Sequence, residues 1–164
     1  MSRVTPRFGA AAVVAALAAL AGCPSDPSLT CVQDVDFSTC PALYQPTWSA
    51  VYENTVVRSC STGGVSCHAA AGAQGGLVLE GSDQAYLALT AGHRYLTPGD
   101  AACSELVERL YSPNPDLVMP RGARLSDPEA CAIGKWVAAG APGPVDLVDA
   151  GVDAPSSSAS GATP

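Results

Sequence analysis

The sequence contains few basic, histidine or aromatic residues. The chain has eight Lys and Arg residues and fifteen Asp and Glu residues, which gives a net charge of −7. A nucleic-acid-binding surface is therefore not expected. There are two histidines, and no Ser-His-Asp or paired-carboxylate pattern stands out, so we expect no enzyme. Aromatic residues make up 5% of the chain. A small domain with so few would have a thin core and would need disulfides or a buried ligand.

The long apolar run near the start is too short to span a membrane as a helix. It covers residues 8–21, follows Arg3 and Arg7, and ends in the sequence LAGC at Cys23. This pattern resembles the signal peptide and lipobox of bacterial lipoproteins. We therefore expect residues 1–22 to be removed and Cys23 to carry lipid; an ordinary signal peptide with a chance cysteine is the alternative.

The residue after the expected lipid site also carries information. Pro24 stands where an aspartate would favour retention in the inner membrane of a Gram-negative cell, so we expect an outer-membrane anchor facing the periplasm or the cell surface. Residues 1–22 contain two basic and no acidic residues, so their removal leaves six basic against fifteen acidic, a net charge of −9. A basic or neutral redox protein is a compatible partner, and nucleic acid is not.

Composition divides the rest of the chain into three parts. Residues 23–46 are rich in Pro, Ser, Thr and Asp and are interpreted as a lipidated N-terminus and tether. Residues 142–164 are mainly Pro, Gly, Ser, Ala, Val and Asp and are interpreted as a disordered tail. One small domain, residues 47–141, remains between them. Beyond Cys23 there are six cysteines, an even number that fits an oxidising compartment.

Helical patterns account for the regular structure of this domain. Residues 47–59 carry apolar side chains at the spacing of one buried helix face. Residues 82–90 predict a short helix with Ser82 as N-cap. Asp100 is expected to cap a third helix that ends at Tyr111.

The last predicted helix has the clearest boundaries. Ser126 and Glu129 form a capping-box pattern, and Gly140 is expected to end the helix. Two long stretches rich in Gly and Pro, residues 60–81 and 112–125, connect the helices and indicate functional or cross-linked loops. The predicted fold class is all-α, a small helical domain with long loops, a flexible tether and a tail.

Several elements stand in an order that points to a known family. Cys67 and His68 follow the first helix, with Cys60 before them and a Gly-rich run after them. Met119 lies in a Val-Met-Pro sequence in the loop before the last helix. In this order, the elements resemble class I c-type cytochromes, in particular the small single-haem domains of exported bacterial lipoproteins. The resemblance covers about residues 47–141.

The resemblance implies one covalently attached haem c. Cys60 and Cys67 would form the thioether links, and His68 and Met119 would be the axial iron ligands. Ligation by His and Met raises the reduction potential relative to two histidines. With both axial positions occupied, the implied function is single-electron transfer outside the cytoplasm by a lipid-anchored protein.

One departure from the family pattern leaves alternatives open. Six residues separate Cys60 from Cys67, where the usual haem motif has two. Gly63 and Gly64 make an outward bulge of this spacer sterically accessible. Alternatively, Cys67 alone attaches haem, or Cys60 and Cys67 form a disulfide and His68 is an ordinary surface histidine. The last case is a haem-free lipoprotein with three disulfides and a binding or envelope-structural role.

Other candidate ligands have simpler interpretations. His93 lies in a polar stretch and is expected to be solvated rather than a distal ligand. Zinc on Cys60, Cys67 and His68 would lack a fourth ligand at a useful spacing. Arg121 and Arg124, which flank the methionine loop, are expected to be solvated, with contact to haem propionates or a partner as the alternative.

The remaining cysteines are interpreted as structural. Cys31 and Cys40 enclose eight residues and could pair locally. Cys103 and Cys131 lie near the starts of the last two helices, which pack together in the resembled family, so a bridge there is also sensible. Four cysteines allow three pairings, and the sequence does not choose among them.

Overall fold

The structure is a computed structural model that describes residues 28–61 and 66–144. Within this part the named elements are all helical, which confirms the predicted all-α class. They are α1 (Trp48–Val51), the π-helix η1 (Tyr52–Cys60), the 3-10 turns η2 (Ser66–His68) and η3 (Gln74–Gly76), α2 (Ser82–Thr90), the 3-10 turn η4 (Ala91–His93), α3 (Glu105–Tyr111) and α4 (Asp127–Ala138). Among these described residues, no helix has the length and apolar character needed to cross a membrane.

Some predictions concern parts of the chain that lie outside the described residues. These are the signal peptide at residues 1–22, the lipid site Cys23, the Gly63-Gly64 bulge and the part of the tail from residue 145 onward.

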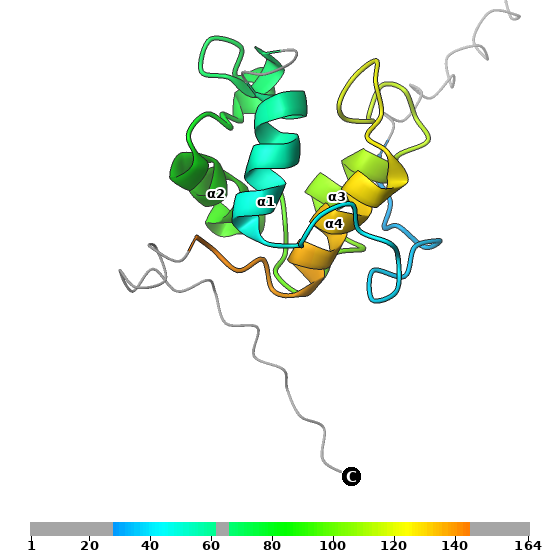
Figure 1. The fold of residues 1–164 in the computed structure, drawn as a ribbon. Coiled ribbons are helices and arrows are strands. Elements are labelled where there is room, and N and C mark those ends of the chain that lie inside the picture. The colour runs from blue at the N-terminus through cyan, green and yellow to red at the C-terminus, as the bar shows by residue number, and fades with distance from the viewer. Residues whose placement is uncertain (1–27, 62–65, 145–164) are drawn as a thin grey trace, which may run out of the picture.

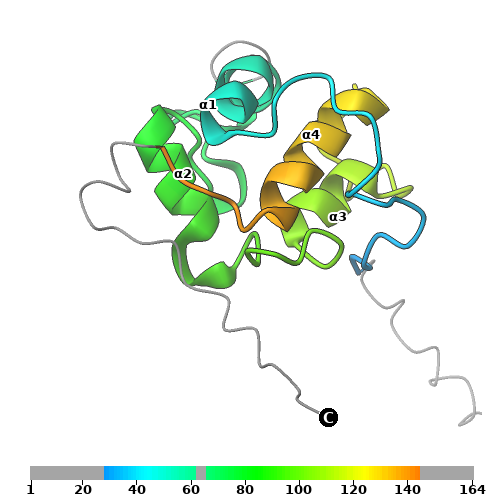
Figure 2. The same ribbon diagram turned by 60° about the horizontal axis from the view of Figure 1, so that its bottom comes forward.

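The helices form two groups around one core. Figures 1 and 2 show α3 and α4 side by side, with α1 and α2 on the other side of the core. The chain after α4 then crosses to α2, where the carbonyl of Ala141 accepts a hydrogen bond from the Tyr86 hydroxyl at 3.1 Å. Pro142, the first residue of the predicted tail, accepts a hydrogen bond from the Trp136 indole at 3.0 Å, so the beginning of that tail is part of the folded domain.

Three aromatic side chains fill the centre. The ring of Trp48 lies 5.2 Å from that of Trp136 and 5.5 Å from that of Tyr86, between centroids. The indole of Trp48 donates to the Ser82 hydroxyl and that of Trp136 donates to the Pro142 carbonyl, each at 3.0 Å. Because the polar group of each ring has a hydrogen-bond partner, these few aromatics build a core that leaves none of these groups unpaired.

The first predicted helix forms, but most of it is wound as a π-helix. The backbone N–H of Ser61 donates to the carbonyl of Val56, five residues earlier, at 2.9 Å. Near the start of this stretch the Asn54 side chain donates to the carbonyl of Ala50 at 2.8 Å. A side chain that occupies a helical carbonyl competes with the i→i−4 backbone bond, which favours the wider turn.

The start of α2 differs from the prediction in one detail. The helix spans the expected residues, but Gly81 takes the N-cap position, and no side chain caps the helix there. The Ser82 hydroxyl instead accepts the hydrogen bond from Trp48. The prediction of Ser82 as N-cap was therefore wrong because a tertiary contact uses its oxygen.

The third helix begins later than predicted, at Glu105. Asp100 does cap a turn, since its carboxylate accepts from the N–H of Cys103 at 3.1 Å, but this turn does not continue into the helix. The buried Ser104 hydroxyl donates to the Asp100 carbonyl at 2.6 Å, which ends the turn before α3. The predicted capping box of α4 is confirmed, because the Glu129 carboxylate accepts from the backbone N–H of Ser126 at 3.0 Å.

Residues 28–46, interpreted from composition as a tether, pack against the domain instead. We call them the N-terminal strap; they pass along α3 and α4 before reaching α1 (Figures 1 and 2). Phe37 is 8% exposed and belongs to the core cluster. Its ring packs so closely on α4 that a Cβ added to Gly134 would lie 2.2 Å from it. The tether interpretation was wrong because a polar composition conceals one deeply buried anchor.

Two disulfides attach the strap. Cys31 pairs with Cys103, and Cys40 pairs with Cys131, over sequence separations of 72 and 91 residues. The structural role expected for these four cysteines is confirmed, but both suggested pairings, Cys31 with Cys40 and Cys103 with Cys131, were wrong. Each strap cysteine instead reaches across to the α3–α4 side of the domain.

Candidate functional site

His68 has a defined orientation at the end of η2. Its Nδ1 lies 3.2 Å from the carbonyl oxygen of Leu77, and its own carbonyl accepts from the N–H of Leu79 at 2.7 Å. Because a carbonyl oxygen only accepts, Nδ1 carries the hydrogen in this bond. The lone pair of Nε2 is then available to a metal, and the ring is fixed by the bond on its other nitrogen.

The loop after His68 turns back to provide this carbonyl. Gly75 and Gly76 adopt φ angles of 64° and 75°, in the left-handed region that favours glycine. The loop is closed by Glu80, whose carboxylate accepts from the N–H of Ala70 at 2.8 Å. The Gly-rich run therefore serves to orient His68, and neither the Leu77 carbonyl nor Glu80 was recognised in the sequence, which shows no motif for them.

Cys60 and Cys67 lie on two elements in contact, η1 and η2, and are thiols in this structure. Among the cysteines that the structure describes, these two form no disulfide. Cys60 packs against the core, and burial, with a further contribution from Cys67, raises the pKa of the Cys60 thiol to about 11. The structure therefore brings together Cys60, Cys67 and His68, three of the four residues expected to bind haem.

Met119, the fourth residue, comes from the loop between α3 and α4. In Figure 1 this loop and the loop that contains His68 lie at the same end of the molecule. Met119 is half-buried between the buried residues Val118 and Pro120, and its N–H donates to the carbonyl of Arg109 at 3.0 Å. The methionine is thus presented by a loop attached to α3.

Arg121 and Arg124 are exposed and also donate hydrogen bonds to this loop. The guanidinium of Arg121 donates to the carbonyl of Asp116, and that of Arg124 donates to the carbonyl of Ser112. Both residues are exposed, as expected for a solvated pair, and carbonyls of the same loop also lie within their reach. His93 is exposed in η4.

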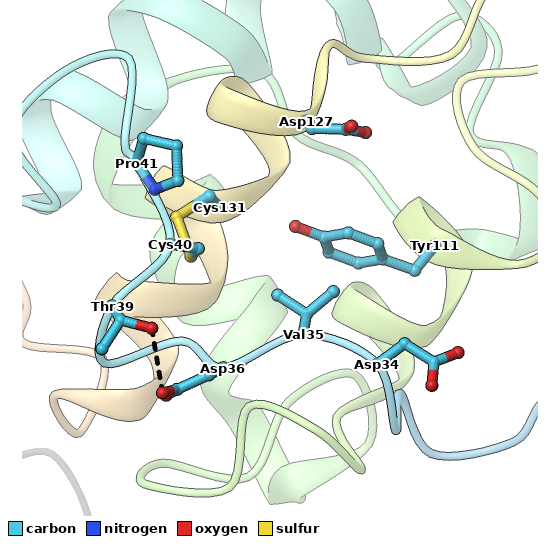
Figure 3. A pocket seen from close by; sticks show the side chains of 9 residues that line it. All are labelled: Asp34, Val35, Asp36, Thr39, Cys40, Pro41, Tyr111, Asp127 and Cys131. Carbon is cyan, nitrogen blue, oxygen red and sulfur yellow. Dashed lines mark hydrogen bonds between the residues drawn. A yellow bond between two sulfur atoms is a disulfide. The ribbon is translucent and has the colours of Figure 1, made fainter.

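The two pockets described on this domain lie along the strap. The first, about 420 Å³, is shown in Figure 3 between the strap and the ends of α3 and α4. The Cys40–Cys131 disulfide, Tyr111 and three aspartates line it, and one of these, Asp36, accepts a hydrogen bond from Thr39 at 2.9 Å. Within the described residues, no group of three or more His, Cys, Asp or Glu side chains is arranged to bind a metal ion.

A comparison with known protein families points to the part of the chain that contains most of the candidate haem-binding residues. The family model described as Planctomycete cytochrome C matches residues 65–121. The match includes Cys67, His68 and Met119 and begins after Cys60. No curated protein and no solved structure matches the chain. Together with the helical fold, the family match supports a cytochrome c-like domain.

Proposed function

We propose that this chain is an exported, lipid-anchored cytochrome of the c type that carries one covalent haem and transfers single electrons. The orientation of His68 is the observation that carries the proposal. Its Nδ1 is engaged by the Leu77 carbonyl at 3.2 Å, which leaves Nε2 for an axial bond. The family match over residues 65–121 includes this histidine and the methionine proposed as the second ligand.

The chemistry of the other residues fits the same group. The thiols of Cys60 and Cys67 would hold haem through thioether bonds; addition of each S–H across a vinyl C=C bond needs no oxidant. Bound haem supplies an iron that accepts and releases one electron. His68 and Met119 would be the two protein ligands of the iron, which would leave no coordination site for a substrate and would favour electron transfer over catalysis.

The proposed location follows from the N-terminus. Lipid on Cys23 would anchor the chain in the cell envelope, and Pro24 favours the outer membrane. With a net charge of −9 after removal of residues 1–22, a redox protein with a basic or neutral surface is the proposed partner, and nucleic acid is not.

The test is the visible spectrum of the full chain, produced in an exporting host that has haem-attachment machinery. The chain is denatured in alkaline pyridine and reduced, after extraction with acidified acetone. We expect a haemochrome band that survives extraction, with a position that distinguishes one thioether from two. His68→Ala should remove the histidine–iron bond and so change the native spectrum, whereas His93→Ala, the matched control on an exposed turn, should leave the spectrum unchanged.

The opposite result has an equally clear meaning. A chain without a haemochrome band, with a mass six hydrogens below that of the reduced polypeptide, would have three disulfides. That result would replace the proposal with the haem-free alternative, a disulfide-stabilised lipoprotein with a binding or envelope-structural role.

A further inference from the structure

Arg109 contacts the methionine loop in two ways. Its guanidinium Nη1 donates to the carbonyl of Leu117 at 3.4 Å, and its own backbone carbonyl accepts from the N–H of Met119 at 3.0 Å. These bonds fall on either side of Val118, which is 7% exposed. One residue of α3 therefore fixes the loop immediately before and at the proposed iron ligand.

The Arg109 side chain is itself held in place. Its Nε donates to the carboxylate of Glu105, one turn earlier in α3, at 2.8 Å. This ion pair is about one-third exposed, so its main effect is to direct the planar guanidinium toward the loop. A lysine has a single ammonium group in place of this fork and would not reproduce both contacts at once.

The loop has few other attachments near the methionine. The N–H groups of Leu117 and Val118 donate to the carbonyl of Asn114, at 3.1 and 2.9 Å, within the loop itself. Arg121 and Arg124 bind the carbonyls of Asp116 and Ser112, farther from Met119 along the chain. Arg109 thus connects the segment that presents Met119 to a helix of the core.

We infer that Arg109 is a positioning residue for Met119, one that keeps the methionine sulfur at its place by fixing the Leu117–Met119 backbone. This inference rests on the proposed function, since it assigns how the second axial ligand is maintained. Loss of the Leu117 contact increases the freedom of the loop, so an external ligand competes with Met119 more successfully. Replacement of methionine by a nitrogen ligand also lowers the reduction potential.

The test compares Arg109→Ala and Arg109→Lys with Arg94→Ala in the haem-loaded full chain. Arg94 stacks on the Tyr95 ring, 4.9 Å from its centroid, and is exposed, and none of the hydrogen bonds of the described residues joins its side chain to the loop, which makes it a matched control. The affinity of the ferric protein for added imidazole is measured from its visible spectrum. For Arg109→Ala we expect a rise of about three- to tenfold, the effect of losing one charge-assisted hydrogen bond. Arg109→Lys should lie between that variant and the unmodified protein.

A second measurement does not depend on haem. Amide hydrogen exchange at Leu117, Val118 and Met119 should accelerate in Arg109→Ala and not in Arg94→Ala. Unchanged imidazole affinity in a haem-loaded Arg109→Ala protein would overturn the inference and leave the proposed function standing. If the unmodified chain carries no haem, the proposed function fails, and unchanged exchange in Arg109→Ala would then overturn the loop-fixing role as well.

Discussion

The contact of Phe37 with Gly134 predicts that Gly134→Ala changes the stability of the protein in opposite directions when Phe37 is present and when it is absent. Alanine at position 134 would place its Cβ 2.2 Å from two ring carbons of Phe37, closer than any real Cβ contact. Because Gly134 lies inside α4 and Phe37 is buried, either the helix or the strap must shift. Such overpacking costs about 1–3 kcal/mol, so Gly134→Ala should destabilise the protein by that amount.

The same substitution should stabilise a protein that lacks the ring. Phe37→Ala alone should cost about 3 kcal/mol, at the lower end for a buried phenylalanine because the strap surface permits some collapse. In that background no ring opposes the new methyl group. Replacing glycine by alanine within a helix then gains about 1 kcal/mol. The difference between the two backgrounds gives an interaction energy of about 2–4 kcal/mol.

Urea denaturation followed by far-ultraviolet circular dichroism, with the disulfides intact, measures the four free energies of unfolding. Leu43→Ala provides the control, since Leu43 belongs to the strap but is 61% exposed. Its effect should add to that of Gly134→Ala. If Gly134→Ala destabilised the Phe37→Ala protein as much as the unmodified one, the ring would not lie on Gly134. The composition-based interpretation of a loose tether would then be correct.

Two further predictions concern the cysteines. Replacing Cys31 and Cys103 by serine should lower the free energy of unfolding by about 4 kcal/mol, given a closed loop of about 72 residues. Peptide mapping of the unmodified chain without reduction should find Cys31 bound to Cys103 and Cys40 bound to Cys131, and a Cys31–Cys40 peptide would refute the connectivity. In the haem-free chain, the pKa of Cys60 is raised from 9.0 to about 11, so this group adds stability below about pH 9 that is lost as the pH rises toward about 11. Its alkylation rate should keep rising to about pH 11; a plateau near pH 9 would contradict the burial.

The fold was predictable where the determinants are local. The helix at Asp127–Ala138 follows from its capping box and apolar spacing, and the span of α2 from its short periodic run. The strap was not predictable because its anchor is one residue, Phe37, in a polar segment, and the surface that receives it is Gly134, almost a hundred residues later. The disulfide pairings failed for the same reason, since both join positions that only the folded chain brings together.

In the candidate site, too, some features were predictable from the sequence and others were not. Cys67, His68 and Met119 were recognisable because their residue types and order form a pattern. The groups that orient them are backbone carbonyls, that of Leu77 for the imidazole and that of Arg109 for the methionine loop. Every residue has a carbonyl, so the sequence carries no signal for which one will be used. Arginine positions were visible in the sequence, but which loop carbonyl each guanidinium reaches depends on the fold.

The crossed connectivity of the strap also has a consequence for biogenesis. A chain is made from its N-terminus, so Cys31 and Cys40 leave the ribosome first, each long before its native partner. At that moment both thiols are available to each other while their native partners have not been made, and random oxidation would join them incorrectly. The Cys31–Cys103 pair can form only after Cys103 has been synthesised, and the Cys40–Cys131 pair only after α4 has begun. Correct maturation therefore depends on delayed oxidation or on thiol–disulfide exchange that undoes early bonds.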